Sequence, residues 1–569
     1  MIVDHITRAE NSRMQGTYVC VSKKLQNSVA PDIIQSVPHT MRLVIICVVV
    51  LLSVTHNALA GRILGLFPHT GRSHQMVFEP LLRSLAERGH QVTVISFFPQ
   101  KGPPQNYTDV SLEGLAEIGM EVIDLQIFES AKTSNIHVVD VLKRIMKQIV
   151  EFNMLADIGL GVCSKLVDFK PVSDTLKQEY DLVLVENFQS DCLLGLAHAH
   201  GVKAPVVAVL SSSFMPWSMD RIGAADNPSY VPVVSNPFTS EMDFFQRLEN
   251  TFIYIYHKIW FRYYIQVKEQ AMIEKKFGKI TDLRDVSKDI VMMMVNTFHS
   301  LNGVRPTLPG IIEVGGMHLA QPAKTIPKFM ERFLNESDHG VVIFSFGSLL
   351  KSSTMPKYKE EIFINVFSKL QERVIWKFEG SDDEGTMVGH NIMRVKWLPQ
   401  YELLQHHKVV AFIGHGGLLG MTEAIAAGKP MLVMPFFGDQ PFNGAAAERA
   451  GLGVVTSYPD LTAESLGAAL RAVLSGATRR SARRAAALWR DRPLAPLACA
   501  QYWVERALRW GRGAPQHSAA RDLPLLQAAL LDLAAALLAP PALAALLLRA
   551  ARRACRASGA RTTHKHKAQ

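Results

Sequence analysis

Residues 409–434 read VVAFIGHGGLLGMTEAIAAGKPMLVM, and this stretch decides the fold. It opens with an apolar run, Val409–Ile413, that is typical of a buried strand. A glycine-rich turn leads into a helical pattern over Leu419–Ala427, and the apolar run Met431–Met434 predicts the next strand. A strand, a helix and a second strand in this order form a βαβ unit, which predicts a parallel sheet.

The same alternation of strands and helices covers most of the chain. The 569 residues are too many for one ordinary core. We therefore predict an α/β fold of two doubly wound halves joined around Gly316–Phe333, with ligands at the carboxyl ends of the strands. The predicted strands are Arg62–Phe67, Gln91–Phe97, Asp181–Val185, Val206–Leu210, Val341–Phe346 and Val374–Phe378, and the predicted helices include Phe78–Arg88 and Asp191–His200.

The turn between the strand and the helix of the opening stretch has the features of an anion site. It reads His415-Gly416-Gly417, and glycines there allow the backbone to approach a ligand closely. The free N–H groups and the positive end of the following helix then face an anion, for which a diphosphate is a natural guest. His415 adds a side-chain donor.

Other polar residues surround this turn in the sequence. Glu423 lies two helical turns further on, where a carboxylate can accept hydrogen bonds from ribose hydroxyls, and Trp397 offers a flat face for a base. Asp439 and Gln440 follow a strand and supply donors and acceptors that suit sugar hydroxyls. The alternative for Asp439 is a helix cap, because aspartate before Gln-Pro suits that position.

This region closely resembles the signature of the UDP-glycosyltransferases that conjugate small lipophilic molecules. The resemblance covers residues 61–569, and its details are similar to the membrane-bound insect branch. It implies a GT-B fold with an acceptor-binding domain over residues 61–316 and a UDP-sugar-binding domain over residues 317–522. The motifs that carry it are WLPQ at 397–400, FIGHGG at 412–417, PFFGDQPFN at 435–443, FPH at 67–69, RGHQVTV at 88–94, DRP at 491–493 and YWVE at 502–505.

The resemblance also implies a catalytic histidine in the loop after the first strand. The matching pair is Ser73-His74, and His69 in the same loop is the rival, with a structural role as its alternative. A histidine at the carboxyl end of a strand suits a general base, because its pKa lies near neutral. The family orients this histidine with an acid, for which we favour Glu186, where relatives often have Asp, over Asp191.

The donor site departs from the family pattern at two positions. Leu419 and Gly420 stand where many members carry Asn and Ser. Phosphate binding then relies on backbone N–H groups, His415 and Ser348, while the resemblance adds Gln400 to the donor-binding residues. The chain has no Asp-x-Asp pair, so we expect no metal and no cofactor apart from the UDP-sugar as co-substrate.

The first sixty residues contain a predicted signal peptide, residues 41–60. Arg42 precedes the apolar run Leu43–Val54, and Ala58-Leu59-Ala60 supplies a cleavage site of the A-x-A type. Residues 1–40 are either an extension from the gene model, with Met41 as the true start, or a translated segment.

A second apolar segment, residues 523–548, predicts a transmembrane helix whose C-terminal side is cytosolic, because basic residues follow it at once. It is interrupted only by Gln527 and Asp532 among polar residues. Asp532 is costly in lipid if it lies centrally, and Pro540 and Pro541 are expected to kink the helix. The alternative is a peripheral helix rich in alanine and leucine.

The net charge of the chain lies mainly at its C-terminal end. Residues 549–569 carry seven bases and no acid, against +10 for the whole chain, so the body is near neutral and a nucleic-acid surface is not expected. Lys565 and Lys567 resemble a dilysine signal for the endoplasmic reticulum. We therefore predict a single-pass type I protein of that membrane with a luminal body, in which Asn106 and Asn335 are glycosylation acceptors.

Two further features of the body bear on its environment. Of the six cysteines, Cys163, Cys192 and Cys499 lie in the body, so at most one intramolecular disulfide is possible there. The aromatic-rich segment 243–264 is a core helix, a wall of an apolar acceptor pocket or a surface that contacts the membrane.

The resemblance implies an enzyme that transfers a hexose from a UDP-sugar to a hydroxyl of a small lipophilic acceptor with inversion. His74 takes the proton of the acceptor hydroxyl, and UDP leaves with its charge at the helix after Gly417. The insect-like details favour glucose over glucuronate. The alternatives are a non-catalytic luminal binder of lipophilic ligands and a transferase acting on protein or lipid-linked acceptors; a homo-oligomer is left open.

Overall fold

The computed structural model describes residues 60–118, 123–130, 134, 136–321, 323–514 and 516–565. The extension over residues 1–40, the signal peptide apart from Ala60, and the end of the tail with Lys567 lie outside the described residues. Everything described below belongs to one compact unit of the chain, which begins at Gly61.

The first half of the chain forms a seven-stranded sheet in which every neighbouring pair is parallel. The chain runs outward from β1 to β3 on one side and then returns to build the other side from β5 onward. The switch in direction therefore lies between β1 and β5, where ligands of such sheets bind. In spatial order the strands are β3 (Tyr107–Ser111), β2 (Gln91–Ser96), β1 (Arg62–Phe67), β5 (Leu182–Glu186), β6 (Val206–Leu210), β7 (Ile290–Val295) and β8 (Ile311–Glu313).

The second half repeats this plan with its switch between β9 and β14. Only the edge strand β12 is antiparallel to its neighbour. The two doubly wound sheets confirm the expected GT-B architecture. In spatial order the strands are β12 (Thr386–Val388), β13 (Ile392–Val395), β11 (Arg373–Lys377), β9 (Val341–Ser345), β14 (Val409–Gly414), β15 (Met431–Val433) and β16 (Gly453–Val455).

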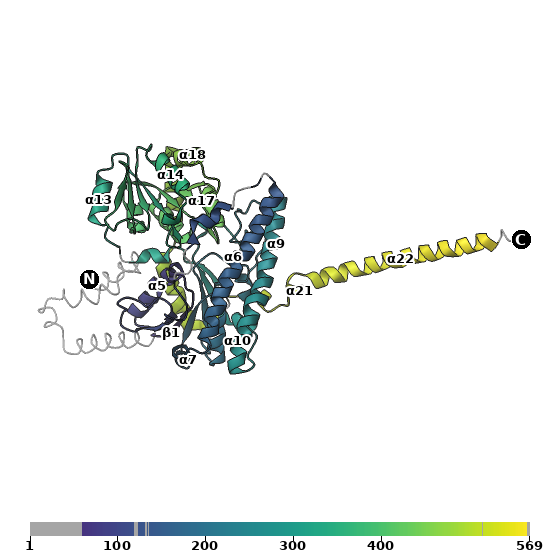
Figure 1. Cartoon of the computed structure of the whole chain (residues 1–569). Helices are drawn as coiled ribbons and strands as arrows, with labels where there is room; N and C mark the ends of the chain where they lie inside the picture. Colours follow the sequence, from purple (N-terminus) through teal and green to yellow (C-terminus); the bar gives the residue numbers. More distant parts are fainter. Residues whose placement is uncertain are drawn as a thin grey trace, which may run out of the picture. The chain divides into compact units, whose positions relative to one another are not determined.

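Helices cover both sheets (Figure 1). In the first half they are α5 (Arg72–Glu87), α6 (His137–Leu166), α7 (Lys170–Leu176), α8 (Cys192–Ala199), α9 (Phe244–Trp260), α10 (Val267–Phe277), α11 (Leu283–Val286) and α12 (His299–Asn302). In the second half they are α13 (Lys328–Asn335), α14 (Lys357–Phe367), α15 (Gln400–Gln405), α16 (Leu418–Ala427), α17 (Gln440–Arg449), α18 (Ala463–Leu474), α19 (Gly476–Arg490) and α20 (Pro496–Trp510).

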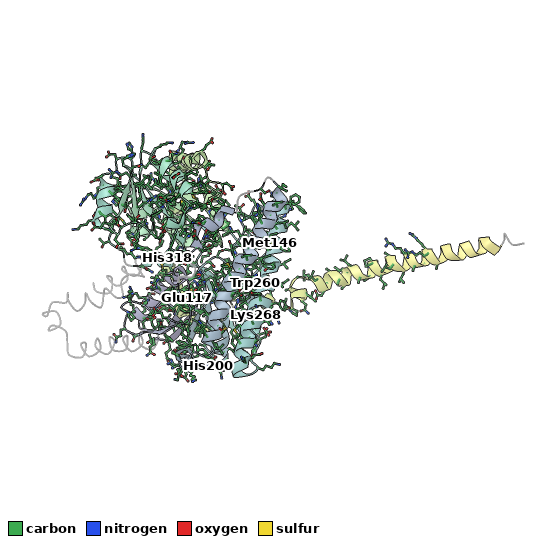
Figure 2. All side chains as sticks on the ribbon, viewed as in Figure 1. Glu117, Met146, His200, Trp260, Lys268 and His318 are labelled. Carbon is green, nitrogen blue, oxygen red and sulfur yellow. A yellow bond between two sulfur atoms is a disulfide. The ribbon has the colours of Figure 1, made fainter. Side chains whose placement is uncertain are left out.

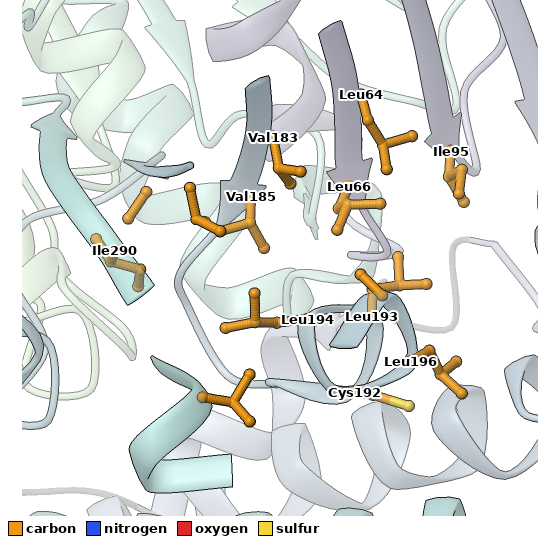
Figure 3. Close-up of a cluster of buried hydrophobic side chains, with 14 of the residues drawn as sticks. Leu64, Leu66, Ile95, Val183, Val185, Cys192, Leu193, Leu194, Leu196 and Ile290 are labelled. Atoms are coloured by element: carbon orange, nitrogen blue, oxygen red, sulfur yellow. The ribbon is translucent and has the colours of Figure 1, made fainter. Parts of the chain in front are cut away.

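The side chains of the first sheet alternate between two cores, as the two-residue period of a strand requires. Leu64 and Leu66 of β1 point into one core, where they meet Leu193 and Leu194 of α8 (Figure 3). Ile63, in contrast, points to the other face, into the core that also contains the helix α5. Both faces of the sheet are therefore buried, which explains why its strands are almost continuously apolar.

The helix α5 begins at Arg72, six residues before the predicted start at Phe78. The residues of its first turn are polar, which a hydrophobic periodicity does not detect. His74, expected in a loop, therefore lies in the first turn of a helix, and its backbone N–H donates to the carbonyl of Gly71 at 3.1 Å.

The helix α20 belongs to the second half in sequence but packs against the first sheet. Ala500, Val504 and Ala507 form one face of the helix and are buried in the core that contains Ile63. Arg88 and Glu505 form an ion pair of 2.6 Å beside it. The chain thus crosses between the two halves a second time, which differs from the predicted boundaries.

Arg492 joins the two crossings of the chain. Its guanidinium donates to the carbonyl of Gly315, in the first crossing, at 2.7 Å. It also donates to the carbonyl of Trp489, at the end of α19, at 2.7 Å and stacks on the ring of Phe298 at 3.7 Å. The Asp-Arg-Pro motif therefore lies where both connecting segments meet.

A third link between the halves comes from residues 123–130. The strand β4 (Ile123–Asp124) pairs in parallel with β10 (Leu350–Lys351) of the second half. Phe128 enters the core of the second sheet, with its ring 5.0 Å from that of Phe436.

The C-terminal apolar segment forms the helix α22 (Leu531–Lys565), and the part from Leu531 to Ala554 is long and apolar enough to cross a membrane. This span starts later than the predicted residues 523–548, because the preceding residues form a separate short helix, α21 (Leu525–Ala528). Asp532 is the second residue of α22 and not a central one. The helix continues through Pro540 and Pro541, where we expected a kink.

One disulfide links α6 to α8 among the described residues. Cys163 and Cys192 form it, and Cys499 is a free thiol. This agrees with the upper limit of one bond set by the three cysteines of the body.

The aromatic-rich segment is partly core and partly surface. Trp260, labelled in Figure 2, and Phe261 are buried against Trp217. Phe252 and Tyr263 are more than half exposed. No residue of the segment lines the large cavity described below, so it is not a wall of that cavity.

Candidate active site

A cavity of about 500 Å³ is lined by residues of both halves. It lies at the switch points of the two sheets, because its lining includes His69, Gly347 and His415, which lie within two residues of the carboxyl ends of β1, β9 and β14. The predicted site residues that line it are His74, Ser348, Trp397, Gln400, His415, Gly417, Glu423, Asp439 and Gln440.

His74 forms a close pair with Glu186 at the first switch point. Its Nδ1 lies 2.5 Å from Oε1 of Glu186, the last residue of β5. The hydroxyl of Ser211, directly after β6, donates to the same carboxylate oxygen at 3.0 Å and lies 2.7 Å from Nδ1 of His74. The three residues meet because β1, β5 and β6 are adjacent strands.

This geometry determines the tautomer of His74. A carboxylate only accepts hydrogen bonds, so the pair with Glu186 requires a proton on Nδ1. In the neutral ring the other nitrogen, Nε2, is then an acceptor. Ser211 was not predicted, although the run of three serines directly after a predicted strand was a usable signal.

His69 packs directly on His74. The two rings are parallel within 2°, with centroids 3.7 Å apart. The N–H of Gly71 donates to Nδ1 of His69 at 2.8 Å. Burial lowers the pKa of His69, and His74 lowers it further. His69 is therefore a neutral ring that supports the orientation of His74.

Asp191, the second candidate for the acid, is engaged elsewhere. Its carboxylate accepts two hydrogen bonds from Arg221, at 2.8 and 3.0 Å, and one from Gln266 at 2.8 Å. Burial raises the pKa of the adjacent Glu269 to about 8, with Asp191 adding to the effect. The structure thus gives Glu186, and not Asp191, as the neighbour of His74.

At the second switch point, the N-terminus of α16 opens onto the cavity. Gly417 is its N-cap and makes no side-chain cap, and Leu418, Leu419 and Gly420 of the first turn also line the cavity. The first N–H groups of a helix have no partner within the helix. The helix has ten residues, so its positive end adds to the attraction for an anion.

The glycines at this turn make room for His415. A Cβ on Gly347 or Gly417 would come within 2.7 or 2.4 Å of the His415 ring. Gly416 has φ of +85°, and a Cβ there would lie 2.9 Å from Val433, so this residue shapes the turn and does not line the cavity. The sequence predicted that the glycines of this turn allow the backbone to approach a ligand. In the structure, Gly347 and Gly417 also leave space for the ring of His415.

His415 is neutral at neutral pH. Burial, together with the charge of Lys377, lowers its pKa to about 4. A neutral imidazole donates one hydrogen bond, and a bound diphosphate would favour the protonated ring.

Trp397, Gln400 and Glu423 all line the cavity. Nε2 of Gln400 donates to Glu423 at 2.6 Å, and burial raises the pKa of Glu423 to about 7. Trp397 is 63% exposed, and Nζ of Lys377 lies 5.8 Å from its ring centre. The exposed indole of Trp397 offers a face to a base, and the carboxylate of Glu423 can accept hydrogen bonds from ribose hydroxyls.

Asp439 occupies the N-cap position of α17 but its side chain makes no cap hydrogen bond, so the cap interpretation is not supported. The carboxylate accepts from Nδ2 of Asn443 at 2.8 Å. Burial raises its pKa, and Asn443 and the nearby His74 act in the opposite direction. The side-chain Oε1 of Gln440 accepts from the backbone N–H groups of Phe436 and Phe437, so this side chain holds the turn, a use that we did not predict.

The described residues include no group of three or more His, Cys, Asp or Glu side chains that could hold a metal ion.

Comparison with known proteins gives consistent matches. The family model described as UDP-glucoronosyl and UDP-glucosyl transferase matches residues 62–566. A UDP-glucosyltransferase 2 of Dactylopius coccus is 32% identical over 471 residues, covering 82% of this chain and 87% of the relative. The UDP-glycosyltransferase UGT5 of the same insect is 34% identical over 485 residues, covering 84% and 89%.

More distant matches extend to mammals and to a solved structure. A mouse UDP-glucuronosyltransferase 2B17 is 30% identical over 455 residues, covering 77% of this chain and 83% of the relative. The crystal structure of the glycotransferase of kitacinnamycin aligns with a TM-score of 0.47 and 16% identity, covering 79% of this chain and 98% of that one.

Proposed function

The chain belongs to the UDP-glucoronosyl and UDP-glucosyl transferase family, and on this basis we propose that it transfers a hexose from a UDP-sugar to a hydroxyl of a small lipophilic acceptor. One observation carries the proposal: the His74–Glu186 pair, the open N-terminus of α16 and the carboxylate of Asp439 belong to one site. A base, an anion site and an acceptor of sugar hydroxyls are the parts that this transfer needs.

The proposed reaction begins at Nε2 of His74, which takes the proton of the acceptor hydroxyl. The acceptor oxygen attacks the anomeric carbon, whose bond to the phosphate oxygen breaks, and the configuration inverts. Glu186 stabilises the imidazolium that forms, at 2.5 Å from Nδ1. The charge of the leaving UDP is held by the N-terminus of α16 and His415.

The acceptor enters next to α6 in this proposal. Met154, Leu155 and Ile158 of that helix line the cavity together with Phe188. Phe188 lies edge-on to His74, with ring centres 4.7 Å apart. An apolar wall beside the base suits a lipophilic molecule that carries one hydroxyl.

The departures at Leu419 and Gly420 leave the phosphates without side-chain hydroxyls or amides at these positions. The open first turn of α16 supplies backbone N–H groups in their place. Leu419 packs against the core of the first half, and Nε2 of Gln400 lies 3.2 Å from where a Cβ of Gly420 would be.

We expect Asp439→Ala and His415→Ala to separate the sugar and the diphosphate in binding. Asp439→Ala should weaken UDP-glucose roughly 10- to 150-fold and leave UDP nearly unchanged, because UDP has no hexose. His415→Ala should weaken both ligands, because both carry the diphosphate. Calorimetric titration of the parent and of both variants with UDP and UDP-glucose measures this.

The titrations also separate the two candidate functions. If the parent binds neither UDP nor UDP-glucose, the transferase proposal fails and a luminal binder of lipophilic ligands replaces it. A structural role of Asp439 predicts equal weakening of both ligands together with a lower Tm.

We further propose that the protein is anchored in the endoplasmic reticulum membrane by α22, with its body in the lumen. The apolar part of α22 supports the anchor, and the disulfide of Cys163 and Cys192 suits an oxidising compartment. Asn106 and Asn335 are both exposed, as glycan acceptors must be. The exposed apolar side chains of α9 suit a surface beside lipid.

Protease added to sealed microsomes is expected to remove only the tail that follows the apolar part of α22, Leu531–Ala554. Treatment with an endoglycosidase should lower the mass of the protein by two glycans, and by one in each of Asn106→Gln and Asn335→Gln. Both results are read on a gel with an antibody to the body. Digestion of the whole chain without detergent would place the body in the cytosol.

A further inference from the structure

Glu151 reaches from the first half of the chain to the turn that carries Asp439. It lies on α6, which approaches the second half near α17 (Figure 1). Its Oε2 accepts from the N–H of Gly438 at 3.4 Å, and its side chain lines the cavity. Lys147, one turn earlier on α6, donates to the carbonyl of Phe436 in the same turn.

The lysines that line the cavity contact or act on groups outside this turn. Among the described residues that line it there are two lysines, Lys324 and Lys377, and no arginine. Lys377 is paired with Glu379 at 2.7 Å and acts on His415, at the anion site. The backbone N–H of Lys324 donates to Glu402, and its charge acts on Glu423.

The sugar end of the cavity is therefore acidic. Asp439 belongs to the second half and directly follows Gly438. Glu151 belongs to the first half and accepts a hydrogen bond from the N–H of Gly438. Lys147, whose Nζ lies 3.8 Å from Oε1 of Glu151, does not line the cavity. A hexose hydroxyl finds acceptors here, whereas a carboxylate on the sugar finds two like charges and no arginine fork.

We propose that Glu151 is a residue of the sugar subsite and that it selects a neutral hexose over a hexuronate. Its carboxylate accepts a hydrogen bond from a hexose hydroxyl and repels a carboxylate at carbon 6. This inference rests on the proposed transfer from a UDP-sugar and adds the charge class of the sugar and the residue that determines it.

The ionisation state of Glu151 determines the pH and the salt concentration at which the proposal is tested. Burial raises the pKa of Glu151, and Lys147 and the N–H of Gly438 act in the opposite direction. Because this pKa is raised, the measurements are made at pH 8 to favour the ionised carboxylate, and low salt keeps the repulsion unscreened.

The test is the ratio of the Kd for UDP-glucuronate to the Kd for UDP-glucose. In Glu151→Gln we expect this ratio to fall about tenfold, because one like charge is removed while the size of the side chain is kept. Glu151→Lys should lower it further, and Glu151→Asp should keep the ratio of the parent. Glu402→Gln is the matched control: it removes a carboxylate that also lines the cavity but lies beside Lys324, so its ratio should not change.

The affinity for UDP alone distinguishes the possible failures. If UDP does not bind to the parent, the proposed transfer itself is wrong. If UDP binds equally to the parent and to Glu151→Gln, both proteins are folded, and a ratio that stays within twofold then overturns the role of Glu151. An equal change in Glu402→Gln would also overturn it, because the effect would then depend on the total charge of the cavity.

Discussion

Replacing His74 with alanine is expected to lower hexose transfer about 10²- to 10⁴-fold, the usual contribution of a general base. The loss should appear in kcat, because Nε2 takes the proton in the transition state. The affinity for UDP should stay the same, since the anion site at α16 belongs to the other half of the chain. Transfer to a phenolic acceptor and calorimetry with UDP measure the two quantities.

A control for His74→Ala must be a histidine that does not contact His74. His69 is stacked on His74 at 3.7 Å and cannot serve as a neutral reference. His137, exposed at the start of α6, is the better choice, and His137→Ala should keep full activity. Activity of His74→Ala within a few-fold of the parent would rule out His74 as the base.

Changing Glu186 to glutamine is expected to cost about 10²- to 10⁴-fold in kcat, although the side chain keeps its size. The carboxylate forces the proton onto Nδ1 of His74, whereas a glutamine amide can donate to Nδ1 and leave the proton on Nε2. Nε2 then cannot accept the proton of the acceptor. The measurement is the pH dependence of kcat in the parent and in Glu186→Gln.

A shorter carboxylate separates this effect from a general disturbance. Glu186→Asp keeps an acceptor for Nδ1, so it should retain far more activity than Glu186→Gln. Equal activities in the two variants would show that the charge of Glu186 does not orient His74.

The predicted strands agree closely with the structure, because they are largely buried on both faces, whereas β3, β7, β8, β12, β13 and β16 were not predicted. The bounds of β1 and β6 agree with the predicted Arg62–Phe67 and Val206–Leu210. A strand buried in this way is a short continuous apolar run between turn signals, which a single sequence reveals. His74 and Glu186 were assigned from the family resemblance, and in the structure they lie near the carboxyl ends of β1 and β5.

The parts that were missed depend on contacts between distant residues. Ser211 lies 137 positions from His74, and Glu151 lies 287 positions from Gly438. No periodicity within a helix or strand records which partners meet across such separations. The packing of α20 against the first sheet was missed for the same reason. Its apolar face predicts that the helix is buried, but not against which sheet it packs.

The meeting of both connecting segments at Arg492 determines how the enzyme can open. Because the two chain crossings are joined at Arg492, we expect the halves to rotate about this point rather than to slide past each other. The pairing of β4 with β10 and the insertion of Phe128 form a separate link between the two halves, which holds them together. We expect product release to require the contacts of β4 and Phe128 to separate. The strength of these contacts would then determine turnover together with the chemistry at His74.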